Sequence, residues 1–379
     1  MKVRALLIVL LLITFFTNVS GQEYSYTRYD VKDGLTGSVV YHGVEDKDGF
    51  LWFATETGVS RFDGTHFKNF TKKDGLPDNE ILKLFVDSKG RVWMMPFRNA
   101  LCYYWKGKIY NTENDHLLNK LSLADRIIDI VEDQQGNFTF ICPAAFYLVN
   151  AQQDIQKITT VENKQFIVGG TGLNAAGHVM AYIVTNHEVH FIEVDKQGTV
   201  LKKALITNDD FNILTRQSTY LSDHLQIHKE KDSLIITTNA GKTRSTLALP
   251  HTFNNLSVIN DSLYVLNTGT GSLFYNIKTG KVIRQALPGI IVNSALRDSE
   301  GNWWFLTGGV GIYRVGSFEF NNYTFSENNK TYRSVFSICK TDSVLYAGTE
   351  NALLFTIDFM RQTIRHQYVF AKPMNTRIL

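Results

Sequence analysis

The chain has 379 residues, of which 12% are aromatic and only 6 are proline, so it can bury a large core and long disordered tracts are not expected. Its formal net charge is +3, and Lys2 and Arg4 at the extreme N-terminus supply two of the positive charges. Without them the chain is close to neutral. It lacks the basic stripe that nucleic-acid binding requires, so we expect no nucleic-acid partner.

The first 21 residues predict a secretory signal peptide. Lys2 and Arg4 precede the apolar run Ala5–Phe16, which is too short to span a bilayer comfortably. Val19 and Gly21 fit the small-residue rule for cleavage. We therefore expect residues 1–21 to be removed and the protein to be exported to the periplasm. A buried helix or an uncleaved anchor is the less favoured alternative.

Residues 46–70 combine short apolar or aromatic runs with glycine-containing turns. In Asp46-x-x-Gly49 the Asp side chain can bond the backbone two residues on, and Gly accepts a positive φ, so a tight turn is predicted. The runs are too short for helices and predict one four-stranded antiparallel unit. Its expected strands, from the inner to the outer, are Ser38 to Val44, Phe50 to Thr55, Val59 to Phe62 and His66 to Phe70.

This unit is repeated along the chain. Asp46, Gly49 and Trp52 have counterparts 41 residues later in Asp87, Gly90 and Trp93. Further copies have their turns at Gly136, Gly177, Asp232, Asp261, Gly301 and Asp342. The mean period is near 42 residues, although the register between residues 177 and 262 is uneven. Such a period of short strands predicts an all-β fold, a β-propeller of about 7–8 four-stranded antiparallel blades.

Both ends of the expected propeller are informative. Tyr26–Tyr29 matches the outer strand Phe67–Phe70 in register, so we expect it to complete the last blade and close the ring. Thr363–Phe370 predicts the eighth outer strand, and Met374–Leu379 starts what resembles another inner strand. We expect residues 22–379 to form the propeller domain and to be truncated at the C-terminus. Whether eight units form one ring, or seven form a ring and the eighth starts another, stays open.

Cysteines and histidines give little indication of chemistry. Cys102, Cys142 and Cys339 lie in strand-like runs without metal-ligand spacing, so we expect buried, unpaired thiols; a Cys102–Cys142 disulfide is the alternative. On a strand, His187 and His190 would point to opposite faces and could not share a metal.

Two further patterns are equally weak. His224 and His228 would lie about 13 Å apart along a strand. Gly170–Ala175 mimics a dinucleotide fingerprint, but a strand-like run follows where a helix is needed. We find no catalytic constellation, and we expect no metal and no cofactor.

Several segments resemble the two-component regulator propeller repeat. They are Asp33–Val40, Asp46–Gly64, Asp74–Asn79 and Gly301–Tyr313. The resemblance implies the periplasmic sensor region of a bacterial membrane histidine kinase, in which a Tyr-rich β-sandwich, a transmembrane helix and a kinase usually follow. None of these parts is present in the 379 residues. The chain is thus expected to be a ligand-sensing domain without enzymatic activity of its own, membrane-tethered in a full-length histidine kinase.

The resemblance also implies an oligosaccharide or another polar small ligand, and either a downstream signalling module or a homodimer partner. Propellers bind ligands in the central channel or on loops at one face. In a four-stranded blade, the loops between second and third strands share a face with the loops between blades. The candidate ligand-binding residues on these loops are Glu56, Asp78, Asn79, Arg98, Asn99, Glu350 and Asn351. For any one of them, an ordinary solvated turn is the commoner explanation.

Two other functions stay open at this point. An exported propeller enzyme, such as a lyase or glycosidase, would need clustered carboxylates or a His–Tyr pair in the central channel; only apolar or neutral inner-strand residues there would exclude it. A propeller used only for protein docking would be favoured by a large apolar patch on one face.

Overall fold

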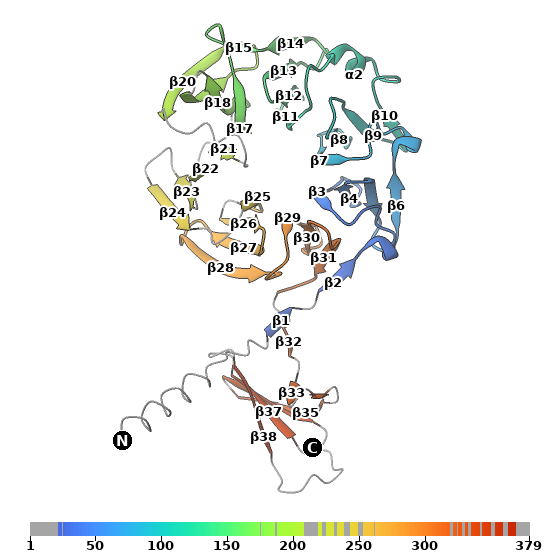
Figure 1. Cartoon of the computed structure of the whole chain (residues 1–379), viewed down its shortest axis with the longest axis vertical. Coiled ribbons are helices and arrows are strands. Elements are labelled where there is room, and N and C mark those ends of the chain that lie inside the picture. The colour runs from blue at the N-terminus through green and yellow to red at the C-terminus, as the bar shows by residue number, and fades with distance from the viewer. Residues whose placement is uncertain are drawn as a thin grey trace, which may run out of the picture. The chain divides into compact units, whose positions relative to one another are not determined.

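The computed structural model divides into two compact units, Thr27–Arg314 and a second unit that combines Met1–Tyr26 with Val315–Leu379 (Figure 1). The structure describes residues 22–24, 26–174, 176–185, 188–207, 219–221, 225–230, 233–238, 243–248, 253–260, 262–318, 321–323, 325–327, 330–332, 335–341, 343–349, 353–358 and 363–368. The predicted signal peptide, residues 1–21, lies outside these ranges. In the described part, no helix is long and apolar enough to cross a membrane.

The described residues of the unit Thr27–Arg314 form seven four-stranded blades, arranged in a ring in Figure 1. The all-β propeller prediction is therefore confirmed. Blade 1 is β3 (Val40–Glu45), β4 (Leu51–Thr55), β5 (Gly58–Phe62) and β6 (Phe67–Phe70). Blade 2 is β7 (Ile81–Val86), β8 (Val92–Pro96), β9 (Cys102–Trp105) and β10 (Lys108–Tyr110). Blade 3 is β11 (Asp129–Glu132), β12 (Phe138–Cys142), β13 (Ala145–Val149) and β14 (Ile155–Ile158).

The remaining blades continue in chain order. Blade 4 is β17 (Ile167–Leu173), β18 (Val179–Thr185), β19 (Glu188–Val194) and β20 (Val200–Thr207). Blade 5 is β21 (Thr219–Leu221), β22 (Leu225–Glu230), β23 (Ser233–Thr238) and β24 (Thr243–Ala248). Blade 6 is β25 (Phe253–Val258), β26 (Leu263–Thr268), β27 (Gly271–Asn276) and β28 (Lys281–Ala286). Blade 7 is β29 (Val292–Arg297), β30 (Trp303–Thr307), β31 (Ile312–Val315) and β2 (Thr27–Tyr29).

Short elements connect the blades of this unit. They are η1 (Val31–Asp33), η2 (Lys72–Asp74), α2 (His116–Leu121) and the hairpin of β15 (Thr160–Val161) and β16 (Lys164–Gln165). The two 3-10 turns begin with a reciprocal capping box and end at Gly34 and Gly75, whose φ values of 103° and 105° require a residue without a Cβ. The Asp-Gly-Leu repeat that precedes blades 1 and 2 therefore encodes the turn between blades.

The ring closes through its N-terminal strand. Residues 27–29 of β2 pair antiparallel with residues 312–314 of β31, and the Tyr29 ring packs between Phe62 of blade 1 and Trp304 of blade 7. The predicted closing strand is confirmed, but it completes the seventh repeat and not the eighth. A sheet edge that would otherwise be open is thereby paired.

The eighth repeat belongs to the second unit. Its strands β35 (Val335–Lys340), β36 (Val344–Thr349), β37 (Leu353–Asp358) and β38 (Thr363–Tyr368) form a separate four-stranded sheet. The other described strands of this unit pair as β1 (Gln22–Tyr24) with β32 (Asn321–Tyr323), and β33 (Phe325–Glu327) with β34 (Lys330–Tyr332).

Blades 4 and 5 depart from the regular pattern. Their inner strands β17 and β21 pair in parallel, which merges the two blades into one eight-stranded sheet. The fifth sequence copy, at Asp232, falls between β22 and β23, the second and third strands of blade 5. The sequence left the register between residues 177 and 262 uneven, and the structure places this copy one strand later in its blade than the regular copies. Gly170 lies within strand β17, whereas a dinucleotide-binding motif must open a helix at this point. The match to that motif is therefore weak, as the sequence indicated.

The repeated Asp and Trp form one buried contact. The indole Nε1 of Trp52, Trp93 and Trp304 donates to the carboxylate six residues earlier, at 2.6, 2.8 and 2.7 Å. Each indole is at most 2% exposed and packs in the core shared with the next blade. Neighbouring side chains of β4 face opposite blades, because Phe53 packs with blade 7 and Trp52 with blade 2.

The cysteine prediction is correct for two residues and wrong for the third. Cys102 and Cys142 are buried and free, and burial raises the pKa of both thiols, that of Cys142 to about 12. The alternative Cys102–Cys142 disulfide is not formed. Cys339 is exposed, because it lies on β35, whose residues are mostly exposed in the second unit.

Candidate ligand site

The propeller has two faces with different turns. The antiparallel order places the hairpins between second and third strands on the same face as the connections between blades, which we call the hairpin face. The turns between first and second strands, and between third and fourth strands, form the opposite face, which we call the Asp-turn face. All of the described candidate residues from the sequence lie in loops of the hairpin face.

Three of these candidates hold loops of blades 1 and 2 in place. The carboxylate of Glu56 accepts hydrogen bonds from the backbone N–H groups of Ser38 and Val39 at 3.0–3.2 Å. Asp78 and Arg98 form an ion pair at 2.9 Å that joins two loops, with Arg98 largely exposed. The structure thus brings Asp78 and Arg98 together and places Glu56 in a separate contact.

The two described Asn candidates also bond to backbone groups. The Asn79 Oδ1 accepts from the Lys72 N–H at 2.8 Å, and the Asn99 Nδ2 donates to the Leu123 carbonyl at 2.7 Å. Glu350 and Asn351 lie outside the described residues. A ligand-binding role for these positions stays a prediction, and each of the five described side chains has a structural contact.

Replacement of Glu56 by alanine is expected to lower the free energy of unfolding by about 1–3 kcal/mol, because two backbone donors lose their acceptor. Glu56→Gln keeps an oxygen acceptor and should lose less. Urea unfolding of both variants measures the difference. Equal stability of wild type and Glu56→Ala, together with weakened ligand binding, would instead assign Glu56 to the ligand.

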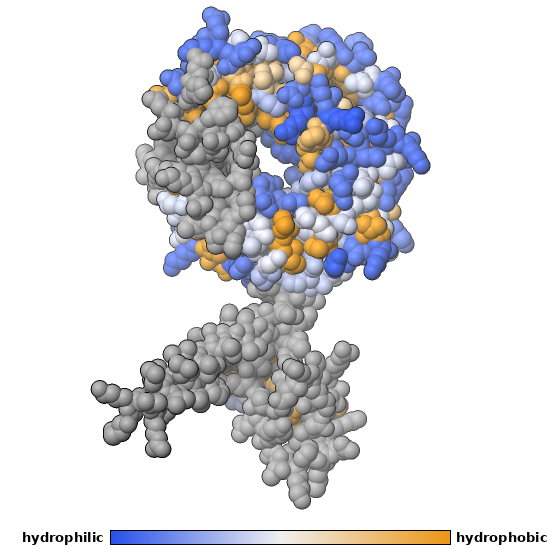
Figure 2. Space-filling model, in the orientation of Figure 1, coloured by the Kyte–Doolittle hydropathy of each residue, from blue (hydrophilic) through white to orange (hydrophobic). Residues whose placement is uncertain are grey.

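The channel wall carries ionisable groups. Figure 2 shows an opening at the centre of the ring. On the inner strands, Lys83 of blade 2 pairs with Asp129 of blade 3 at 2.6 Å, and Asp129 accepts from Thr171 of blade 4 at 3.3 Å. Tyr41 donates to Glu80 at 2.9 Å, and burial followed by this contact raises the pKa of Tyr41 to about 12. The inner strands are therefore not uniformly apolar or neutral.

His42 stands beside this chain of contacts as a neutral acceptor. Burial and the nearby Lys83 ammonium lower the pKa of His42 to about 3, and its Nδ1 accepts from the Leu84 N–H at 3.4 Å. A histidine with so low a pKa stays unprotonated at physiological pH. It is suited to hold blades 1 and 2 together.

The pH dependence of stability should reveal His42. Below pH 6.5 the unfolded chain takes up a proton on this residue, whereas the folded protein does not until about pH 3. The free energy of unfolding should therefore fall as the pH falls through this window, by up to about 1.4 kcal/mol per pH unit from His42. The His42→Gln variant should show a shallower slope between pH 6 and 4. Identical slopes for the two proteins would contradict this prediction.

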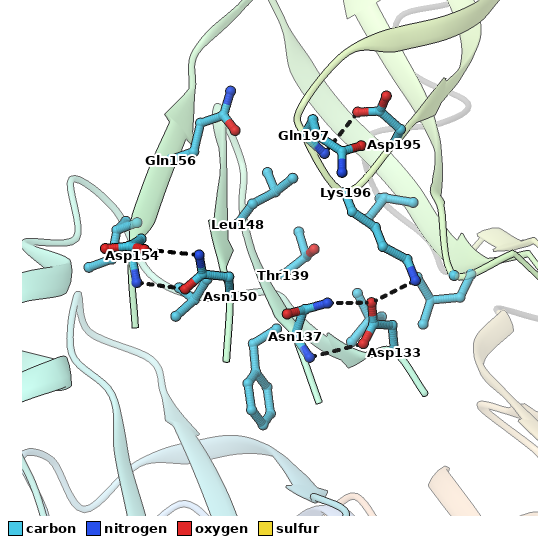
Figure 3. A pocket seen from close by; sticks show the side chains of 17 residues that line it. Asp133, Asn137, Thr139, Leu148, Asn150, Asp154, Gln156, Asp195, Lys196 and Gln197 are labelled. Carbon is cyan, nitrogen blue, oxygen red and sulfur yellow. Dashed lines mark hydrogen bonds and ion pairs between the residues drawn. The ribbon is translucent and has the colours of Figure 1, made fainter. Parts of the chain in front are cut away.

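A cavity of about 450 Å³ lies between blades 3 and 4 and opens on the Asp-turn face (Figure 3). Its deep walls are mainly aliphatic, and polar side chains surround its rim. The wall includes Val131, Thr139, Leu148, Leu173 and Val179, and the rim includes Asp133, Asn150, Asp154, Gln156, Lys196 and Gln197. We call this cavity the 3–4 pocket.

The repeat pattern explains why the 3–4 pocket exists. Blade 3 keeps the turn aspartate as Asp133, but the residue six positions later is Thr139, where blades 1, 2 and 7 have tryptophan. The cross-strand neighbour of that tryptophan is Arg61 in blade 1 and Tyr103 in blade 2, whereas Thr139 pairs with Leu148. Two smaller side chains thus replace two large ones on the face of blade 3 that packs against blade 4.

Asp133 keeps part of the hydrogen bonding found in the other blades. Its Oδ2 accepts from the Asn137 side chain at 2.8 Å and from the Lys196 ammonium of blade 4 at 3.1 Å. Burial acts to raise the pKa of Asp133, but the bonds from Asn137 and Lys196 outweigh it and hold the pKa below its ordinary value. Asp133 is therefore a charged acceptor at the edge of the pocket.

Two other cavities lie in the same unit. One of about 430 Å³ between blades 7 and 1 also opens on the Asp-turn face, but there the Trp304 ring forms part of the wall. Another of about 660 Å³ lies along β25, β29 and His42. Sequence reasoning searched the hairpin face and missed these sites. The signal for the 3–4 pocket was present in the sequence. At Thr139, an Asp-x-x-Gly turn between the first and second strands of a blade is not followed by tryptophan.

The described part of the chain holds no cluster of three or more His, Cys, Asp or Glu that could bind a metal ion. His190 is buried and contacts Glu188 at 3.0 Å, while His187 and His224 lie outside the described residues. For His228, on β22, only the strand is described.

These features define a seven-bladed β-propeller with a polar channel and cavities between blades. Solved structures with this fold include the extracellular domain of the hybrid two-component system BT3049 from B. thetaiotaomicron, with a TM-score of 0.67, 16% identity and coverage of 93% of this chain and 50% of that chain. A catalytically inactive virginiamycin B lyase from Staphylococcus aureus with quinupristin has a TM-score of 0.58 and 12% identity, over 77% of this chain and 99% of that one.

A third similar structure is PorZ, a surface component of the type-IX secretion system of Porphyromonas gingivalis. It has a TM-score of 0.55 and 10% identity, over 90% of this chain and 46% of that one. The present chain thus spans about half the length of two of these proteins. At these identities the likeness shows the fold alone. No model of a known protein family matches the chain, and no curated protein matches it.

Proposed function

We propose that this chain is the extracytoplasmic ligand-sensing domain of a two-component sensor histidine kinase. The observation that carries the proposal is the similarity to the extracellular domain of a two-component system over 93% of the chain. The predicted signal peptide and the propeller-repeat motifs agree with it. The kinase, the transmembrane helix and the periplasmic location belong to the proposal.

The partners also belong to the proposal. The propeller would bind an oligosaccharide or another polar small ligand and change its contacts with a downstream signalling module or a second subunit. Calorimetric titration of the folded protein against a glycan panel tests the ligand class. If no glycan produces heat while the protein remains folded, the proposed oligosaccharide ligand is wrong. The sensor role is then tested separately, by measuring transcription.

The sensor role is tested in the bacterium that carries the chain. Deletion of the gene is expected to change the transcription of a small set of genes, and the intact gene should restore it. A deletion that leaves transcription unchanged in all growth media but blocks protein secretion would reject the sensor role in favour of a propeller used only for protein docking. PorZ, whose structure is similar, is a surface component of a secretion system.

A propeller enzyme is the second candidate, because the lyase structure matches over nearly its whole length. Only apolar or neutral inner-strand residues in the channel would exclude an enzyme. Lys83 and Asp129 form a charged pair there, so an enzyme is not excluded. His42 accepts a backbone hydrogen bond and has a pKa of about 3, so it is a poor general base. Mass spectrometry of quinupristin and of glycans incubated with the protein tests this candidate. A cleaved product that Asp129→Asn no longer forms would establish it.

A further inference from the structure

We propose that the 3–4 pocket binds an indole group, with the ring where other blades place a tryptophan side chain and the ring N–H directed at Asp133. The proposal concerns binding alone; only a signalling consequence would rest on the proposed sensor function. The indole has two possible sources, a free small molecule or a tryptophan side chain of a peptide. The chemistry that the pocket recognises is the same for both.

The propeller itself supplies the template. In three blades an indole fills the space between its own blade and the next one, and the aspartate six residues earlier accepts its N–H. The rings of Trp93 and Trp304 meet side chains of the following blade, among them Phe140 and Phe53. The interface between blades 3 and 4 has the same strand order and the same turn, but Thr139 supplies no ring.

The hydrogen-bond acceptor for such a ring is already in place. In blade 7, Asp298 Oδ2 accepts from the Asn302 side chain at 2.8 Å and from the Trp304 indole at 2.7 Å. In blade 3, Asp133 Oδ2 accepts from Asn137 at the same distance of 2.8 Å. The second donor there is the Lys196 ammonium, at 3.1 Å. Lys196 thus occupies the hydrogen-bonding position that belongs to an indole N–H elsewhere in the protein.

Lys196 can leave this position at small cost. Its side chain is 28% exposed, lies on the turn between β19 and β20, and also donates to Gln135. An arriving indole N–H would replace one ammonium hydrogen bond on Asp133, while Lys196 keeps its contact with Gln135 and gains water. The carboxylate keeps its hydrogen bonds from the Gln135 N–H and from the N–H and side chain of Asn137, so it stays fully hydrogen-bonded when the indole N–H replaces the ammonium.

The walls favour an aromatic ring over a sugar. Thr139, Leu148 and Val179 are all at most 8% exposed and lie behind the polar rim. Sugar hydroxyls placed against Leu148 and Val179 would lose hydrogen bonds to water without replacement. A planar ring gains dispersion contacts there. Polar substituents on the ligand can meet the rim, where Figure 3 shows Asn150, Gln156 and Gln197.

Isothermal titration of the folded protein with indole, benzothiophene and N-acetyl-tryptophanamide tests the proposal. Indole should bind saturably, and benzothiophene, which has the same shape but no N–H, should bind several-fold more weakly. Tighter binding of N-acetyl-tryptophanamide than of indole points to a peptide side chain as the natural ligand, and the reverse order points to a free molecule. Either order supports the pocket assignment.

Variants locate the binding. Thr139→Trp should fill the pocket from within, raise the melting temperature and reduce indole affinity at least tenfold. Thr139→Val is the matched control, because it changes the hydroxyl but keeps the space, and it should bind indole as wild type does. If Thr139→Trp does not fold, Leu148→Phe fills the same space from β13. Absence of saturable indole binding to the wild type, or equal binding to the filled variant, overturns the proposal.

This experiment is independent of the sensor proposal. Indole binding without any transcriptional effect of gene deletion would reject the sensor role and keep the site. Conversely, a transcriptional effect in a protein that does not bind indole would reject the site and keep the sensor role.

Discussion

Replacement of Trp93 by threonine is expected to lower the free energy of unfolding by about 3–5 kcal/mol, the range for removal of a large buried aromatic ring. The Trp93 ring is fully buried, packs against Tyr103, Phe138 and Phe140, and donates to Asp87. Asp87 itself is 1% exposed and would lose one of its donors. The measurement is urea or thermal unfolding followed by circular dichroism.

The same change should create a second indole site between blades 2 and 3. Added indole is therefore expected to restore part of the lost stability of Trp93→Thr, because a ligand that binds only the folded state stabilises it by mass action. The variant should be made in the Thr139→Trp background, which closes the natural pocket, so that any rescue reports the new cavity. Trp93→Phe keeps a ring without the N–H donor and should lose less stability.

One outcome would contradict both the second indole site and the 3–4 pocket. A folded Trp93→Thr protein whose melting temperature does not respond to indole would show that a missing ring and a buried aspartate are not sufficient to bind one. That outcome would also remove the template on which the 3–4 pocket assignment rests.

Removal of β2 is expected to open the ring. A chain that begins at Asp30 lacks residues 27–29, so β31 keeps β30 but loses its partner on the outer side, and the Tyr29 ring no longer packs between Phe62 and Trp304. We expect a loss of at least about 3 kcal/mol in the free energy of unfolding. We also expect self-association, because an exposed strand edge pairs with other chains.

A chain that begins at Tyr26 is the matched control. It lacks β1 but keeps β2, and its propeller unit should melt close to the temperature of the longer chain. Thermal unfolding and analytical ultracentrifugation of the two shortened proteins give both readouts. A monomeric protein of unchanged stability without β2 would mean that the contacts between blades 7 and 1 hold the ring without the closing strand.

Much of the fold could be predicted because its signals are local and repeated. The Asp-x-x-Gly turn at Gly49 depends on a few neighbouring residues, and Gly49 has the positive φ of 83° that the turn needs. The Asp46 to Trp52 contact depends only on a spacing of six along one hairpin. Because such units recur at a fixed period, the strand order within a blade and the closing role of Tyr26–Tyr29 followed from the sequence.

The candidate ligand residues could not be predicted with the same success. Polar loop residues such as Glu56 and Asn99 looked available, but their partners, the Ser38 N–H and the Leu123 carbonyl, come from segments 18 and 24 residues away. Whether a loop side chain bonds to protein or faces a ligand depends on how two loops meet. Sequence spacing does not contain that information.

The sequence by itself determined the blade, its period and the position where the buried tryptophan is replaced by Thr139. The tertiary structure decided that seven blades and not eight share a ring, since closure depends on β2 reaching β31 across most of the chain. It also decided that the loss at Thr139 leaves a pocket. Neighbouring side chains could have filled that space, and only the structure shows that Leu148 of blade 3 and Leu173 and Val179 of blade 4 line a cavity there and do not close it.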